Sequence, residues 1–225
     1  MGKSVRAPSF RLTFLRAVWW YIAYFVLTTW MKLCYRIRVR GARNIPRRGP
    51  VLFVSNHQSY LDPIIVGVGA FRRPFFSLAR ATLFDNRIFG AAIRSYNAIP
   101  VEQGAADTSA MRKCIEVLKN DQALLIFPEG ARTEDGQVHE FAPGTMLLIK
   151  RARPVVVPVA VQGAYDVWRR GQKRPRYFGR LAVHFGEPIT ADELMAVTDD
   201  KPMEHLRKIV QGLLDAETHA KAQRG

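Results

Sequence analysis

Acidic residues are missing from the first quarter of this chain of 225 residues: none occurs from Met1 to Leu61, and Asp62 is the first. Over the whole sequence, Lys and Arg number 34 against 19 for Asp and Glu, a net charge of +15. So large a surplus indicates anionic partners: nucleic acid, anionic lipid, or an acidic carrier or substrate. The hydrophobic content of 48% is that of a globular protein, and the length suits one well-packed domain.

Several kinds of functional residue are also scarce. The two cysteines, Cys34 and Cys114, have neither metal-ligand nor redox spacing, which argues against a disulfide scaffold and an oxidising compartment. There is no G-x-S-x-G sequence, which disfavours a serine nucleophile of the hydrolase type. Apart from His57, the histidines are scattered without zinc-ligand spacing, so we expect no metal site; they are His139, His184, His205 and His219.

Long hydrophobic runs are few, and the most notable extends from Ala17 to Met31 between Arg16 and Lys32. As a helix it would span about 22 Å, less than the roughly 30 Å of a bilayer core. Its aromatic residues prefer the headgroup level, so we predict a helix lying in or dipping into one leaflet; they include Trp19, Trp20 and Trp30. The alternatives are a tilted spanning helix and a buried core helix. A nucleic-acid-binding arm would not normally enclose such a run, so we expect no nucleic acid partner.

Beyond this segment, strand-like and helix-like stretches alternate. Short apolar runs predict buried strands at 51–54, 75–78, 98–101, 123–127, 155–161 and 181–185. Helices are predicted between them, for example at 63–68 and 145–151, and at 203–214 near the carboxyl end. This alternation predicts an α/β fold with a mostly parallel central sheet flanked by helices. We expect residues 1–40 to form a membrane-associating segment and residues 41–225 to form the main domain.

A histidine and a carboxylate stand five residues apart in the sequence Asn56-His57-Gln58-Ser59-Tyr60-Leu61-Asp62. On a regular helix they would lie about 140° apart around the axis, so a pairing requires a turn between them. Asn56 and Ser59 favour a turn. A paired His57 could take a proton from an alcohol while Asp62 holds the ring and stabilises the imidazolium. Asn56 and Ser59 would orient the turn or donate hydrogen bonds to a developing oxyanion.

A second segment, Phe127 to Arg132, follows the predicted strand at 123–127. Gly130 permits a tight turn and the close approach of a ligand, and Arg132 supplies a permanent charge with a geometry suited to phosphate. We expect Glu129 to align Arg132 or to bond a glycerol hydroxyl. Taken alone, this segment could equally be an ordinary β-turn with solvated charges.

A proline interrupts the strand-like run at 155–161. Pro158 in so apolar a stretch predicts an edge strand or a bulge. Its neutral surroundings could face an acyl chain, although a core strand is at least as good an interpretation.

These segments together resemble the glycerolipid acyltransferase family, specifically the 1-acylglycerol-3-phosphate acyltransferases, over roughly 51–163. His57 and Asp62 look like the family's catalytic pair, and Glu129, Gly130 and Arg132 resemble its phosphate-binding block. Val157-Pro158 is similar to a further block. The resemblance implies acyl transfer from acyl-CoA or acyl carrier protein to the sn-2 hydroxyl of lysophosphatidic acid, without a metal or bound organic cofactor. It also implies attachment to a membrane, for which we expect anionic lipids and the cytoplasmic face of the inner (plasma) membrane.

Two departures from the family pattern concern the acceptor headgroup. Gln103 stands where an arginine that helps to hold phosphate is usual, and Ala131 replaces a threonine. Arg94 could offset the lost charge, or a basic run could do so; it comprises Arg169, Arg170, Lys173, Arg174, Arg176 and Arg180. That run could equally be a solvated or lipid-facing loop. A different lysolipid acceptor, and a non-catalytic protein that binds anionic membranes, therefore remain as alternatives.

Overall fold

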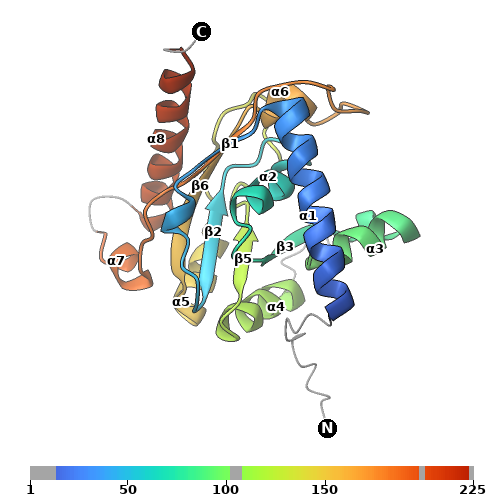
Figure 1. Ribbon diagram of the computed structural model, residues 1–225. Coiled ribbons are helices and arrows are strands. Elements are labelled where there is room, and N and C mark those ends of the chain that lie inside the picture. The colour runs from blue at the N-terminus through green and yellow to red at the C-terminus, as the bar shows by residue number, and fades with distance from the viewer. Residues whose placement is uncertain (1–13, 102–107, 198–200, 223–225) are drawn as a thin grey trace.

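A seven-stranded sheet forms the centre of the molecule, in the order β1-β7-β6-β2-β5-β3-β4 (Figure 1). The computed structural model describes residues 14–101, 108–197 and 201–222. All neighbouring strands are parallel except β6 and β7. The predicted α/β fold with a mostly parallel sheet is therefore confirmed. The strands are β1 (Arg38–Arg40), β2 (Val51–Ser55), β3 (Phe75–Arg80), β4 (Ala98–Val101), β5 (Ala123–Ile126), β6 (Val155–Gln162) and β7 (Ala182–Phe185).

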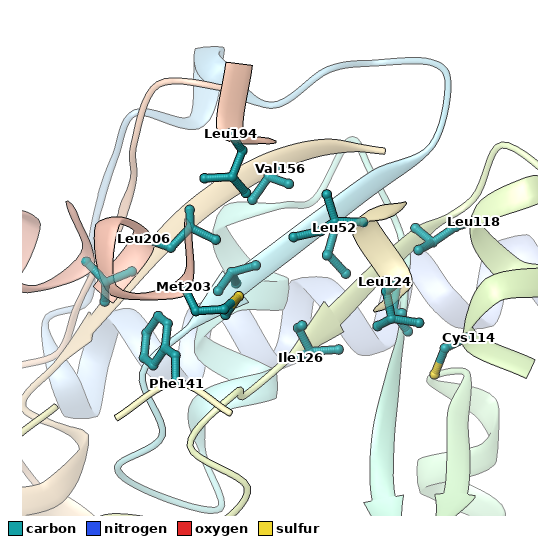
Figure 2. Close-up of a cluster of buried hydrophobic side chains, with 14 of the residues drawn as sticks. Leu52, Cys114, Leu118, Leu124, Ile126, Phe141, Val156, Leu194, Met203 and Leu206 are labelled. Atoms are coloured by element: carbon teal, nitrogen blue, oxygen red, sulfur yellow. The ribbon is translucent and has the colours of Figure 1, made fainter. Parts of the chain in front are cut away.

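Helices cover both faces of the sheet, which explains why the central strands are apolar at nearly every position. On one face Leu52 and Val54 pack with side chains from α4, α5 and α8, and Figure 2 shows part of this cluster. On the other face Val51 and Phe53 pack with α1, α2 and α6. The helices are α1 (Phe14–Tyr35), α2 (Asp62–Gly69), α3 (Arg87–Ser95), α4 (Thr108–Lys119), α5 (Gly144–Ala152), α6 (Ala164–Trp168), α7 (Ala191–Met195) and α8 (Pro202–Ala222), with 3-10 turns η1 (Ala42–Asn44) and η2 (Ala81–Phe84).

The parallel register aligns the carboxyl ends of β2 and β5. Val51 pairs with Ala123, and the pairing continues to Val54 opposite Ile126. The chain therefore leaves both strands at the same edge of the sheet, and the segments that follow, 56–61 and 127–132, begin side by side. This edge is where parallel α/β sheets usually bind ligands.

The N-terminal helix α1 is longer than predicted and joins the core at its carboxyl end. Met31 and Tyr35 are buried, and the Tyr24 hydroxyl donates to the Val68 carbonyl of α2 at 3.0 Å. Another face of α1 stays exposed, including Ile22 and Phe25. Within the described residues, no helix has the length and apolarity needed to cross a membrane. The helix thus packs on the domain through one side and presents apolar side chains on the other.

The prediction of an edge strand at Pro158 is wrong, because β6 lies between β2 and β7. The ladder with β7 ends at Val159, and pairing on that side resumes only at the bridge between Val156 and Ile189. Pro158 falls between these two points, where its carbonyl accepts from the Gly186 N–H at 2.8 Å. Because the pairing on this side is interrupted at position 158, no N–H is required there, and a proline is accommodated.

Candidate functional site

A tight turn, 56–62, joins β2 to α2 and is referred to below as the histidine turn. Asn56 anchors its start: its side-chain amide donates to the Val161 carbonyl at 2.9 Å, and its oxygen accepts from the Val161 N–H at 2.8 Å. The side chain thus continues the sheet pairing with β6 after the backbone of β2 has turned away. Asn56 is only 1% exposed, so the structure assigns it to orienting the turn.

Asp62 closes the turn by collecting three donors on one oxygen. Its Oδ2 lies 2.7 Å from Nδ1 of His57, and it accepts from the backbone N–H groups of Gln58 at 2.6 Å and Ser59 at 2.7 Å. The predicted meeting of imidazole and carboxylate is therefore confirmed. Because a carboxylate only accepts at this site, Nδ1 carries the ring proton, and Nε2 is left with a lone pair.

The pair combines a buried acid with a reachable base. Asp62 has no exposed surface, whereas the His57 side chain is 20% exposed. The imidazole also stacks on the Phe127 ring, with 4.0 Å between centroids. Ring orientation is thus fixed by Asp62 at one nitrogen and by Phe127 on one face. This arrangement suits proton transfer at Nε2.

The Ser59 hydroxyl is engaged within the turn. It donates to the Trp168 carbonyl at 2.8 Å and accepts from the Leu61 N–H at 3.1 Å. Of the two roles predicted for Asn56 and Ser59, the observed bonds of both residues correspond to orienting the turn.

The second segment, 127–132, is referred to below as the arginine loop. Gly130 has a φ of +74°, in the left-handed region, and its N–H donates to the Phe127 carbonyl at 3.0 Å. An added Cβ would meet no atom within 4 Å, so backbone conformation rather than crowding favours glycine here. The tight turn predicted from the sequence is confirmed.

Glu129 ties the two segments together, which the sequence did not predict. Its Oε1 accepts from the His57 N–H at 2.8 Å, and its Oε2 accepts from the His139 N–H at 3.3 Å. Burial raises the pKa of Glu129 above its ordinary value, and the two N–H bonds oppose this rise only in part. Among the described residues, Glu129 thus bonds to backbone N–H groups and does not align Arg132 as expected; its bond to a glycerol hydroxyl stays a prediction. The Thr133 N–H adds a bond to the His57 carbonyl at 2.8 Å.

Arg132 lies on an aromatic ring that belongs to the histidine turn. Its guanidinium carbon is 3.5 Å from the centroid of Tyr60, and the Tyr60 ring lies 5.2 Å from that of Trp168. The Nη1 of Arg132 is buried and has no hydrogen-bond partner among the residues that the structure describes. A buried guanidinium nitrogen without a partner favours an anionic ligand. Sequence reasoning missed Tyr60, although an aromatic residue within the histidine turn was visible.

Other predicted residues lie elsewhere or outside the described ranges. Pro158 is buried in β6 on the face that carries Val156 and Ala160, and its contact with an acyl chain stays a prediction. Arg94 belongs to α3 and sits over the Phe84 ring at 4.9 Å. Gln103 falls within 102–107, outside the described residues.

Comparison with known proteins identifies the family of this chain. Residues 36–162 match the family model described as Acyltransferase. A chloroplastic 1-acyl-sn-glycerol-3-phosphate acyltransferase of Arabidopsis thaliana is 26% identical over 74% of this chain and 48% of its own length. The enzyme of the same name from Streptococcus pneumoniae is 28% identical over 66% of this chain and 53% of its own. The chain thus spans about half the length of these two relatives.

A solved structure shares the fold. The crystal structure titled 1-acyl-sn-glycerophosphate (LPA) acyltransferase, PlsC, from Thermotoga maritima gives a TM-score of 0.70 at 23% identity. The match covers 90% of this chain and 83% of that one. Nearly all of the architecture described above is therefore common to the two proteins.

Proposed function

The chain belongs to the acyltransferase family, and from that premise we propose that it acylates the sn-2 hydroxyl of lysophosphatidic acid to give phosphatidic acid. The acyl group would come from a thioester donor, either acyl-CoA or acyl carrier protein. The names of the relatives support this acceptor. The observation that carries the proposal is the pair of His57 Nδ1 and Asp62 Oδ2 at 2.7 Å, joined to the loop of Arg132 by the bond from the His57 N–H to the Glu129 carboxylate.

In the proposed reaction His57 is the general base. Nε2 takes the proton of the acceptor hydroxyl as that oxygen attacks the thioester carbonyl, and Asp62 stabilises the imidazolium. The tetrahedral intermediate then collapses: the carbon–sulfur bond breaks, and His57 returns the proton to the departing thiolate. One ester bond forms, one thioester bond is lost, and the base is regenerated.

In the same proposal Arg132 holds the phosphate of the acceptor. Its stacking on Tyr60 fixes the plane of the guanidinium and leaves the unpartnered Nη1 for a phosphate oxygen. Gly130 keeps the adjoining turn open to the ligand. Glu129 acts indirectly, because one of its two bonds holds the backbone N–H of His57 and the other holds that of His139. It is a positioning residue in this scheme.

We also propose that α1 attaches the protein to a membrane containing anionic lipids, at the cytoplasmic face of the inner membrane. The exposed apolar side chains of the helix, with basic residues around it, support this attachment. A lysolipid acceptor that stays in the bilayer would then reach the site without crossing water.

A second acceptor remains a candidate because of two sequence positions. Ala131 and Gln103 differ from the family pattern at places linked to the phosphate. A lysolipid with another headgroup would be acylated by the same base and the same thioester chemistry.

The test is a panel of lysolipids offered to purified protein with acyl-CoA and acyl carrier donors, with products identified by mass spectrometry. We expect phosphatidic acid from the wild type and from His205→Ala, a control substitution on α8. His57→Ala should form none while still sedimenting with anionic vesicles. Product formation by His57→Ala near the wild-type rate would refute the mechanism. Acylation of another lysolipid alone would replace the acceptor, and vesicle binding without any product would favour a non-catalytic lipid-binding protein.

A further inference from the structure

The segment between α6 and β7, residues 169–180, is fastened to the carboxyl end of α1. The Gly179 N–H donates to the Cys34 carbonyl at 3.2 Å, and the Tyr35 hydroxyl donates to the Arg176 carbonyl at 2.8 Å. The Arg176 N–H donates to the Val167 carbonyl of α6 at 2.9 Å. This segment, called the 169–180 loop below, is therefore held by bonds to both α6 and α1.

The loop carries two adjacent aromatic side chains into solvent. Tyr177 is 79% exposed and Phe178 is 75% exposed. Beside them, Leu33 of α1 is 74% exposed, and Leu33 and Phe178 line the same surface pocket. Neighbouring apolar side chains this exposed indicate an interaction surface.

Positive charge surrounds these apolar side chains. The sequence has no acidic residue from Val167 to Gly186. The exposed cations come from both the loop and the end of α1: Lys32, Arg36, Lys173, Arg174, Arg176 and Arg180. Aromatic side chains at the tip with a basic surround match the layering of a bilayer surface, where apolar groups enter and cations meet anionic headgroups.

We propose that the 169–180 loop and the carboxyl end of α1 form one docking surface for a bilayer that contains anionic lipids, with Tyr177 and Phe178 entering the headgroup region. The proposal builds on the membrane association proposed for α1 and adds a second point of contact. A single helix can roll about its axis on a membrane. Two contacts fastened to each other set the orientation of the whole domain.

The orientation matters because the loop begins at the candidate site. Trp168, the last residue of α6, accepts from the Ser59 hydroxyl and lies against the Tyr60 ring. In Figure 1 the arrows of β2 and β5 point toward the end of the molecule where α6 and the carboxyl end of α1 lie. Docking through the loop would therefore place Arg132, which rests on Tyr60, close to headgroup depth.

The test is sedimentation with vesicles of phosphatidylcholine containing phosphatidylglycerol, without any substrate. We expect Tyr177→Ser with Phe178→Ser to weaken binding about tenfold, equivalent to about 1.4 kcal/mol, because rings at headgroup depth are only partly removed from water. Tyr96→Ser, which removes an aromatic residue exposed to 43% after α3, should leave binding unchanged. Arg174→Gln with Arg176→Gln should weaken binding to these anionic vesicles and leave binding to vesicles of phosphatidylcholine alone unchanged.

Wild-type affinity in the double serine variant, with a circular dichroism spectrum like that of wild type, would overturn the proposal. A second measurement avoids dependence on that variant: hydrogen exchange of wild-type residues 173–178 should slow on anionic vesicles, and an unchanged rate would also overturn it. If an acidic protein were the partner, anionic vesicles would not slow hydrogen exchange in residues 173–178, and the serine substitutions would not change vesicle binding. That result would also overturn the proposal. The readouts need no acyl transfer, so failure of the proposed reaction would leave them interpretable.

Discussion

The histidine turn and the arginine loop both follow buried parallel strands, yet they are held in different ways. In the turn, Asp62 gathers the His57 ring and two backbone N–H groups on one oxygen. In the loop, Glu129 reaches outward to the backbone of His57 and His139. Asp62 thus stabilises the turn from within, in addition to the bonds of Asn56 and Ser59 to β6 and α6, whereas Glu129 ties the loop to neighbouring segments.

The two segments also differ in which polar group is left for a ligand. The turn presents one face of an imidazole, and its buried atom without a partner among the described residues is an acceptor, Asp62 Oδ1. The loop keeps a buried guanidinium nitrogen without a partner among the described residues. The first arrangement suits moving a proton, and the second suits holding a fixed anionic charge. Substitutions in the two segments should therefore have different kinetic consequences.

The largest effect is expected for Asp62→Asn. The amide can keep an acceptor near the backbone N–H groups but cannot stabilise a protonated His57, so kcat should fall about 10³- to 10⁴-fold. Steady-state kinetics at saturating acceptor measures this, and Asp166→Asn, an exposed change on α6, is the control. A variant that folds and keeps kcat within a factor of about ten would remove the distinction between the two segments.

A smaller effect, on acceptor binding, is expected for Arg132→Ala. Loss of a charge-assisted contact of about 2–3 kcal/mol should lower kcat/KM roughly 30- to 100-fold for a phosphate-bearing acceptor. The same change should hardly matter for monoacylglycerol, which lacks the phosphate. Arg151→Ala, an exposed change on α5, provides the matched control. An equal loss of kcat/KM with both acceptors would mean that Arg132 does not bind the phosphate.

Tyr60→Ala tests the stacking that links the two segments. Removing the ring beneath Arg132 should raise the acceptor KM about three- to tenfold and leave kcat nearly unchanged, given about 0.5–1.5 kcal/mol for such a contact. Tyr60→Phe retains the ring face and should restore the wild-type KM. If the phenylalanine variant behaved like the alanine variant, the hydroxyl rather than the ring would be responsible.

The smallest effect concerns a titrating group outside both segments. Burial lowers the pKa of His184 on β7 below its ordinary value of 6.5, Arg40 adds to this, and Glu217 opposes it. The unfolded chain therefore binds this proton more readily, and stability falls as pH drops from about 6.5 through the folded pKa. His184→Gln should reduce the loss of Tm between about pH 7.5 and pH 5.5 by roughly 2 °C, measured by calorimetry. An identical pH profile in the variant would show that His184 makes no such contribution.

Local rules predicted the parts of the site that depend on neighbouring residues. Helical geometry excluded a His57–Asp62 contact within a helix and so required the turn that is observed. Gly130 indicated a tight turn, and the apolar runs placed both segments at the ends of buried strands. These inferences need only chain geometry over a few residues.

Contacts between distant segments were beyond such rules. Glu129 binds the backbone of a residue 72 positions away, and no spacing in the sequence marks that partner. The stacking of Arg132 on Tyr60 likewise depends on which strands lie side by side. Pro158 predicted an edge strand or a bulge, and local rules could not decide between them, because the choice depends on whether a further strand lies beyond β6.

The bonds around the His57 backbone bear on how such proteins could be re-engineered. Its N–H is held by Glu129 and its carbonyl by the Thr133 N–H, so the proposed base is fixed by the segment that carries Arg132, the proposed phosphate-binding cation. A chimaera that imports a new 127–133 segment to change headgroup preference also replaces the mount of the base. A chimaera should therefore exchange residues 127–133 and 56–60 together. Libraries that vary headgroup selectivity are best built with Glu129 unchanged.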